Sequence, residues 1–305
     1  MNTKNSGSGT CFREVAEKWL DTVAARKNRS WKQQKRQLER HVYPAWKNRD
    51  ITDLRRRDVY LLLDGLDGKV LPNRILALLK TVMNFAVLRE WVEKSPADGI
   101  PMPRHERPRQ RVLTMGELSV VQEACVQLGY PFGSFVQMLM LTAQRRTEVA
   151  SMRWAEIDFD SMNWVLPAMK TKSYTAHSVP LSSFSAALLK GISVNGEFVF
   201  SNDGRTHISG FSSGKRQLDA RANSVRGQVE GWRLHDLRRS AATHMVRLGA
   251  RETIVSRILN HSQNGLTTRV YALHSHAADK RCALQNWGKE LKRNLGNIAG
   301  HDLAS

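Results

Sequence analysis

The sequence predicts a mainly α protein of two helical units, with a small antiparallel β-sheet in the second unit. Three observations support this prediction. Apolar residues recur at steps of three and four over much of the chain, which is the period of a helix with one buried face. Two short apolar runs, 164–167 and 177–181, flank a polar turn and are typical of a hairpin. A proline-rich segment, 96–112, separates the two helical regions.

The composition indicates a globular protein with a polyanionic partner. At 305 residues and 41% hydrophobic content, the chain is long enough for two domains with their own cores. Lys and Arg number 47 against 28 Asp and Glu, which gives a formal net charge of +19. These basic residues are dispersed along the chain, so an extended positive surface is expected, with nucleic acid as the leading partner.

The sequence argues against a membrane partner and against a zinc site. No apolar run approaches the roughly 18 residues that a bilayer span requires, and the polar start, 1–10, is expected to be disordered and lacks a signal peptide's apolar segment. Cys11, Cys125 and Cys282 lie far apart, which fits reduced thiols. A cytoplasmic location follows as an expectation.

The first unit, 11–95, is expected to be all helical. Ser30 is the expected N-cap of its second helix, and Pro72 suits the first turn of its last helix. The pair Tyr43-Pro44 is expected to break the helical pattern. Apolar spacing places helices at about 12–23, 30–41, 58–64 and 72–91.

The segment 96–112 is expected to be a linker, because it contains four prolines and several arginines. Two interpretations remain open for its positive charges. They either follow a sugar-phosphate backbone or belong to a merely solvated loop.

The second unit opens with Thr114, which can cap a helix together with Glu117 three residues later. Two or three helices are expected to follow, up to about Met152. After the hairpin, helices return at about 182–190 and 212–221.

The stretch 232–245 is expected to be a helix that carries a histidine and an arginine next to its buried face. Asp236 suits its first turn, and Gly249 offers a left-handed stop. His235 and Arg238, three residues apart, then project side by side near the buried face. A buried unpaired charge is costly, so such a pair suits a bound phosphate better than a core. The same spacing recurs at His244 and Arg247, so the pair alone does not identify a site.

Further chemistry-bearing residues follow in a fixed order. Arg145 stands in an apolar helical context, with Glu148 one turn later to orient it. Lys172 lies in the polar turn between the two expected strands. His261 closes a helix, and Tyr271 follows ten residues later.

This ordered set resembles the tyrosine recombinases, the phage integrase family, over most of the chain. The resemblance implies a helical core-type DNA-binding domain at 11–95, a catalytic domain at 113–285 and a C-terminal tail at 286–305. Ala143 stands where many members have glycine, which puts the local backbone conformation in doubt. The family's site positions fall on Arg145, Lys172, His235, Arg238, His261 and the nucleophile Tyr271.

The chemistry of strand cleavage suits these residue types. A guanidinium group stays charged and can form two parallel hydrogen bonds with a phosphate, so Arg145 and Arg238 are expected to clamp the phosphate. A free tyrosine has a pKa near ~10, so Tyr271 needs a proton acceptor, which we expect to be His235. Lys172, with Lys170 as the alternative, is expected to protonate the departing 5′ oxygen. His261 is expected to donate to a phosphate oxygen.

The resemblance therefore implies a site-specific recombinase or integrase of a mobile element, associated with the nucleoid, that works through a 3′-phosphotyrosine without metal, ATP or cofactor. It also implies a homotetramer on double-stranded DNA carrying specific recombination sites, with DNA-bending accessory proteins as possible partners. A type IB topoisomerase-like nicking-closing enzyme and a non-catalytic DNA-binding regulator are the alternatives. Whether a C-terminal helix with Leu284, Trp287, Leu291 and Leu295 docks on its own domain or on a neighbour stays open.

Overall fold

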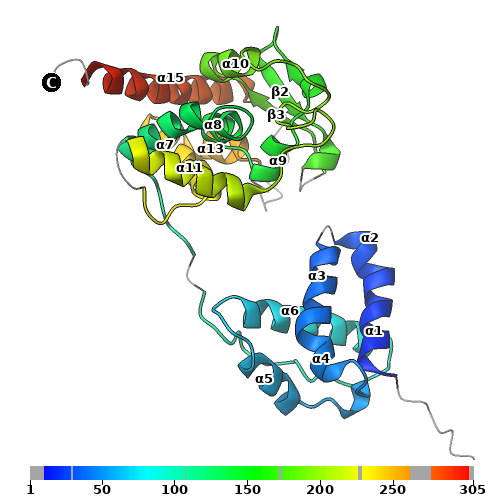
Figure 1. Ribbon diagram of the computed structural model, residues 1–305. Coiled ribbons are helices and arrows are strands. Elements are labelled where there is room, and N and C mark those ends of the chain that lie inside the picture. Colours follow the sequence, from blue (N-terminus) through cyan, green and yellow to red (C-terminus); the bar gives the residue numbers. More distant parts are fainter. Residues whose placement is uncertain are drawn as a thin grey trace, which may run out of the picture. The chain divides into compact units, whose positions relative to one another are not determined.

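The computed structural model describes residues 10–28, 30–106, 108–171, 174–225, 229–261 and 276–301 (Figure 1). The chain divides into two compact units, Met1–Arg109 and Gln110–Ser305, and each has its own hydrophobic core. The expected mainly α fold with a small antiparallel sheet is confirmed. None of the described helices combines the length and the apolar content that crossing a bilayer requires.

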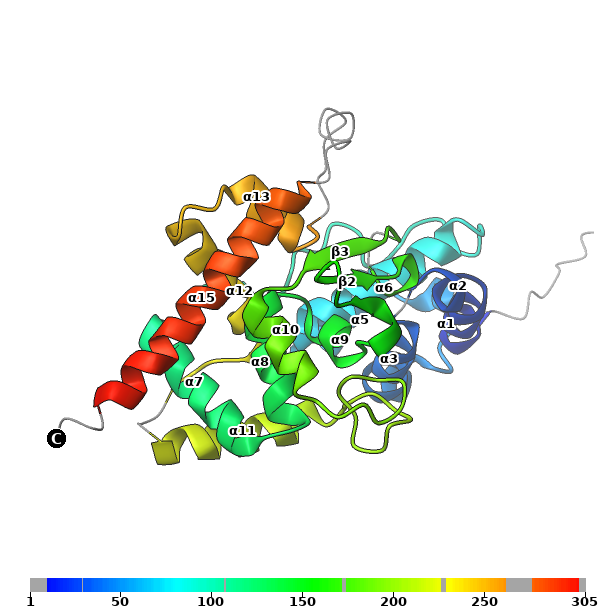
Figure 2. The same ribbon diagram turned by 90° about the horizontal axis from the view of Figure 1, so that it is seen from above.

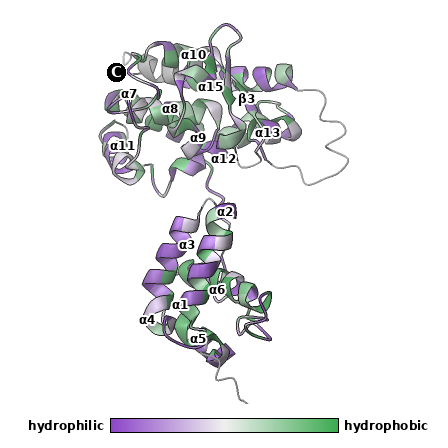
Figure 3. Cartoon of the chain, turned by 90° about the vertical axis from the view of Figure 1, so that its right-hand side faces the viewer, coloured by the Kyte–Doolittle hydropathy of each residue, from purple (hydrophilic) through white to green (hydrophobic). Residues whose placement is uncertain are grey.

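The regular secondary structure of the first unit is helical within the described residues, apart from an isolated bridge between Cys11 and Asp50. Its helical elements are α1 (Phe12–Trp19), the π-helical turn η1 (Leu20–Ala24), α2 (Ala25–Lys27), α3 (Trp31–Gln37), the π-helical turn η2 (Leu38–Val42), α4 (Tyr43–Trp46), the 3-10 turn η3 (Ile51–Asp53), α5 (Arg56–Asp64) and α6 (Leu71–Val87). Helix α6 packs against α1 and α5 and contributes many of the core side chains. By contrast α3 is hydrophilic along its length, and its Lys32, Lys35 and Arg36 are exposed (Figure 3).

The expected helix break at Tyr43-Pro44 is wrong. The helical path continues from α3 through η2 into α4, with Tyr43 and Pro44 at the start of α4. Pro44 lies in the first turn of α4, directly after the π-helical turn. Helix α6 also ends earlier than expected, since the chain turns at Glu90 with a left-handed φ of 58°.

The linker is fastened to each unit by polar contacts. In the first unit the buried Asn73 side chain donates to the Arg104 carbonyl at 2.7 Å and accepts from the Arg104 N–H at 3.0 Å. In the second unit the Leu113 N–H donates to Ser240 Oγ at 2.8 Å. These bonds hold the chain at Arg104 and at Leu113, while the described residues of 101–110 are exposed except for the half-buried Pro103. The segment is therefore anchored at points and otherwise faces solvent.

The second unit surrounds its small sheet with helices. Its elements are α7 (Met115–Leu128), α8 (Phe132–Thr142), α9 (Arg146–Ala150), the 3-10 turn η4 (Trp154–Glu156), β1 (Ile157–Asp158), β2 (Asn163–Leu166), the 3-10 turn η5 (Ala168–Lys170), β3 (His177–Pro180), α10 (Ser183–Lys190), α11 (Phe211–Val225), α12 (Leu234–Arg247), α13 (Glu252–Ile258) and α15 (Ala277–His301). The antiparallel order is β1-β2-β3, with Leu166 opposite His177. Strand β1, two residues long, was not expected from the sequence.

The capping box at the start of α7 is confirmed. The Glu117 N–H donates to Thr114 Oγ1 at 3.2 Å, and the Thr114 N–H donates to Glu117 Oε2 at 2.8 Å. These two bonds satisfy backbone donors that the first turn of a helix leaves free, so they fix where α7 begins.

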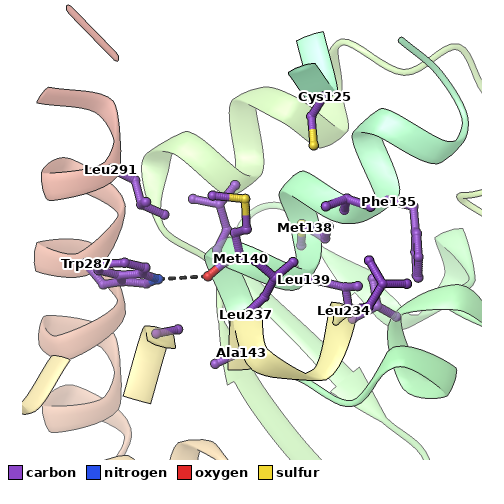
Figure 4. Close-up of a cluster of buried hydrophobic side chains, with 14 of the residues drawn as sticks. Cys125, Phe135, Met138, Leu139, Met140, Ala143, Leu234, Leu237, Trp287 and Leu291 are labelled. Atoms are coloured by element: carbon purple, nitrogen blue, oxygen red, sulfur yellow. Dashed lines mark hydrogen bonds between the residues drawn. The ribbon is translucent and has the colours of Figure 1, made fainter. Parts of the chain in front are cut away.

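Helix α15 folds back on its own unit. It packs against α7, α8, α12 and α13, beside which it runs in Figure 2. Trp287 is fully buried, and its Nε1–H donates to the Met140 carbonyl at 2.8 Å (Figure 4). Its ring stacks on that of His244. Leu284 and Leu291 are buried on the same face. Leu284, Trp287 and Leu291 thus dock on their own domain, one of the two arrangements that the sequence left open. The expected boundary between the catalytic domain and the C-terminal tail, at 285/286, falls inside this helix.

We expect Trp287→Ala to destabilise the second unit by about 3–5 kcal/mol, because it removes a fully buried indole and leaves a cavity. Urea denaturation of the full chain measures this free energy of unfolding. Lys289→Ala, at an exposed position of the same helix, should change it by less than about 0.5 kcal/mol. Equal stability of the two variants would mean that α15 does not dock this way in solution.

Candidate active site

Helix α12 places Arg238 in the interior of the second unit. The Arg238 residue is only 5% exposed. Its Nη1 donates to the Ala143 carbonyl at 2.7 Å, and its Nη2 donates to the Leu259 carbonyl. Burial lowers the pKa of Arg238 to about 10, and nearby Arg145 acts in the same direction. The guanidinium therefore stays charged at pH 7, and within the described chain its hydrogen bonds go to neutral carbonyls.

Ala143 adopts the backbone conformation that its carbonyl contact requires. It ends α8 in the left-handed region, with φ 56° and ψ 21°. A residue other than glycine accepts some strain there. The departure from the family's glycine is therefore accommodated, and the turn still presents its carbonyl to Arg238.

Arg145 is held by a carboxylate and by a second carbonyl. It is the N-cap residue of α9, and its Nη1 donates to Glu148 Oε1 at 2.9 Å. The backbone N–H of Arg145 donates to the other oxygen of Glu148, as the spacing predicts. Its Nη2 donates to the Asn260 carbonyl at 3.1 Å. The two arginines thus hold adjacent carbonyls, Leu259 and Asn260, directly before His261.

His261 and His235 share the electrostatic environment of the two guanidinium groups. Burial lowers the pKa of His261, and the charges of Arg238 and Arg145 lower it further. Burial also lowers the pKa of His235, helped by Arg238 and Arg239. Both imidazoles are therefore mainly neutral at pH 7. The structure brings together four of the six residues that the sequence singled out.

An open basic pocket adjoins this cluster. It has a volume of about 530 Å³ and lies between the start of α9, the start of α11 and the start of α12. Its lining includes the cations Arg145, Arg146, Lys215 and Arg233, together with His235. Such a lining suits a polyanion that extends beyond a single phosphate.

Two predicted site residues, Lys172 and Tyr271, lie outside the described residues. The alternative lysine, Lys170, is described: it forms an ion pair with Glu156 and also donates to the Ser151 carbonyl. That amine is held in a structural contact.

Two buried donors at the site were not singled out as functional from the sequence. Gln144 Nε2 and His177 Nε2 both donate to the Ile258 carbonyl, at 2.9 and 3.0 Å. The one sequence signal for Gln144 is its position beside Arg145. His177 gave no such signal, because nothing in the sequence links it to a turn 81 residues away.

Comparison with known proteins adds independent observations. The phage integrase family matches residues 112–278, and the phage integrase central domain matches residues 12–101. Prophage integrase IntZ of Escherichia coli is 31% identical over 59% of this chain, which spans 46% of that relative. Tyrosine recombinase XerC of Vibrio parahaemolyticus is 24% identical over 80% of this chain and 81% of its own length.

Solved structures show the same fold. A lambda integrase tetramer bound to a Holliday junction aligns with a TM-score of 0.69 at 14% identity, covering 86% of this chain and 80% of that one. The Tn1549 transposon integrase in complex with circular intermediate DNA aligns with a TM-score of 0.64 at 15% identity, covering 90% and 98%. Because the family matches span both units and include the cation cluster, the chain belongs to the phage integrase family.

Proposed function

We propose that this chain is a site-specific DNA recombinase that cleaves and rejoins strands through a 3′-phosphotyrosine on Tyr271. The observation that carries the proposal is the convergence of Arg145, Arg238, His235 and His261 around one point of the second unit. Such a cluster, bonded largely to neutral carbonyls, is suited to bind an anion.

The two arginines stabilise the charge that develops during cleavage. Attack of a phenolate on the phosphodiester places extra negative charge on the non-bridging oxygens, and fixed cationic donors lower that barrier. Arg238 is held by two turns, and Arg145 by Glu148 and Asn260, so neither must reorganise when the phosphate arrives. His261 supplies a further donor to the phosphate.

Proton transfer is divided between two residues. A neutral His235 accepts the proton of Tyr271, and Lys172 donates one to the departing 5′ oxygen. The structural pairing of Lys170 with Glu156 supports Lys172 for this role. The phosphotyrosine keeps the energy of the broken bond, so a DNA hydroxyl reverses the reaction without ATP.

The relatives favour recombination over the nicking-closing and regulatory alternatives, because their names are integrase and recombinase. The lambda integrase tetramer on a Holliday junction supports a homotetramer on double-stranded DNA. Within this proposal, 11–95 binds core DNA, 113–285 is catalytic, accessory proteins bend the DNA, and the protein works at the nucleoid in the cytoplasm.

We expect Tyr271→Phe to abolish the covalent protein-DNA adduct on a nicked suicide substrate, because phenylalanine has no nucleophilic oxygen. DNA affinity should stay within about two-fold of wild type, since no phosphate contact is removed. Denaturing gels measure the adduct and mobility shifts measure affinity. An adduct retained by the phenylalanine variant would place the nucleophile on another residue.

The rate of adduct formation should fall as the pH decreases, because only neutral His235 accepts a proton. The pKa of His235 lies below its usual value, so the rate is expected to level off by pH 7 and to decline in more acidic solution. His235→Gln should lower the rate about 100-fold or more. It should also remove the decline in rate that the protonation of His235 causes at acidic pH. An unchanged profile in this variant would assign the proton acceptor elsewhere.

DNA affinity should fall steeply with salt, by about 1000-fold between 50 and 200 mM for roughly six phosphate contacts. Arg146, exposed at the basic pocket, offers a test of single contacts. Arg146→Gln should weaken binding to all sequences alike and reduce the slope of log K against log salt by about one. A binding constant independent of salt would contradict an extended contact with the backbone.

A further inference from the structure

Three consecutive backbone carbonyls immediately before His261 are each held by side chains from distant parts of the chain. The Ile258 carbonyl accepts from Gln144 and His177, the Leu259 carbonyl from Arg238, and the Asn260 carbonyl from Arg145. These donors come from the turn between α8 and α9, from β3 and from α12. The turn 258–260 is therefore a common anchor for the candidate catalytic groups.

The backbone of this turn needs such partners. Helix α13 ends at Ile258, and the last carbonyls of a helix have no intrahelical donor. Asn260 then takes a left-handed φ of 48°, which turns the chain before His261. The carbonyls at this helix end are free to accept hydrogen bonds from other parts of the chain. The side chains that donate to them therefore fix the position of the backbone that leads into His261.

Two of the four donors are arginines that the proposed function already uses. The other two are buried: Gln144 is 1% exposed and His177 is 8% exposed. Gln144 Nε2 also donates to the Thr142 carbonyl at 2.8 Å, which ties the end of α8 to the end of α13. His177 ties β3 to the same carbonyl.

We propose that His177 and Gln144 are positioning residues for the strand-cleavage reaction, which hold the Ile258 carbonyl and thereby fix His261 relative to Arg145 and Arg238. This inference rests on the proposed function. It extends that function to two side chains that need not touch the DNA.

The surroundings of His177 make it a neutral donor. Burial is the main cause that lowers the pKa of His177, to about 4, and Lys280, Arg238 and Arg145 lower it further. Lys280, on α15, is itself buried and donates to the carbonyl of Ser178, the next residue of β3, at 2.6 Å. With these cations facing it, the imidazole stays uncharged at pH 7, and the contact to a carbonyl places its proton on Nε2.

The test is a double-mutant cycle on the rate of adduct formation by the full chain. We expect His177→Leu to slow cleavage at least about 10-fold, because a shift of a catalytic group by about 1 Å costs on the order of 100-fold. DNA affinity should stay within about two-fold. In a His261→Ala background the leucine change should have almost no further effect, since the group that it positions is absent. A suicide substrate with a 5′-bridging sulfur, a better leaving group, keeps slow variants measurable.

Two more variants make the result specific. Gln144→Met removes the other donor to the same carbonyl at similar side-chain length, and it should show the same dependence on His261 even if the leucine variant does not fold. His177→Gln keeps an amide donor and should restore most of the lost rate.

A matched control comes from His244, another buried histidine whose Nε2 donates to a backbone carbonyl, that of Leu113 at 2.8 Å. His244→Leu removes a comparable contact about two turns beyond Arg238, so any effect on cleavage should be independent of His261. Two outcomes would overturn the positioning roles. One is a wild-type cleavage rate in both His177→Leu and Gln144→Met. The other is a loss of rate in these variants that adds to the loss caused by His261→Ala, as is expected for the His244→Leu control. A wild-type chain that forms no adduct would reject the proposed function, and this inference with it.

Discussion

The buried guanidinium of Arg238 is the constraint around which the second unit is arranged, because it has no hydrogen-bonded carboxylate among the described residues. Such a group is tolerated only when its N–H donors are satisfied, and here two turns far apart in the sequence supply carbonyls at Ala143 and Leu259. One turn ends α8 in a left-handed conformation, and the other follows α13. The ends of these two helices are thus fixed by the same cation that α12 carries inward.

The same arrangement sets the protonation of the site before substrate arrives. Carbonyl oxygens satisfy the N–H groups of Arg238 but do not cancel its charge. Its field, together with that of the Glu148-paired Arg145, adds to burial in lowering the pKa values of the neighbouring imidazoles. His235 is therefore mainly neutral at pH 7, as its proposed role of proton acceptor requires. In the proposed function a phosphate diester brings negative charge to this cluster, so the same groups would bind the backbone of DNA and promote the attack of the nucleophile.

Sequence patterns within a few residues predicted much of this structure, but they could not predict contacts between residues far apart in the chain. The apolar spacing of Leu234, Leu237 and Ala241 placed His235 and Arg238 on one helix, and the box of Thr114 and Glu117 located the start of α7, because both depend on neighbours within a turn. The continuation through Pro44 depends on a π-helical turn that apolar spacing does not encode. The roles of His177 and Gln144 depend on a backbone carbonyl, which no residue type reveals. Docking of α15 on its own unit depends on the contacts that bury Trp287. The apolar spacing of that helix fits packing on its own domain and on a neighbouring subunit equally well.

The most direct measurement is a crystal structure of the chain trapped on a suicide DNA substrate. The account predicts a phosphate joined to the oxygen of Tyr271, with its non-bridging oxygens about 3 Å from the guanidinium nitrogens of both Arg145 and Arg238. It also predicts that the carbonyl contacts at 258–260 are retained. A phosphate joined to another residue, or one bound out of reach of the two arginines, would contradict the account.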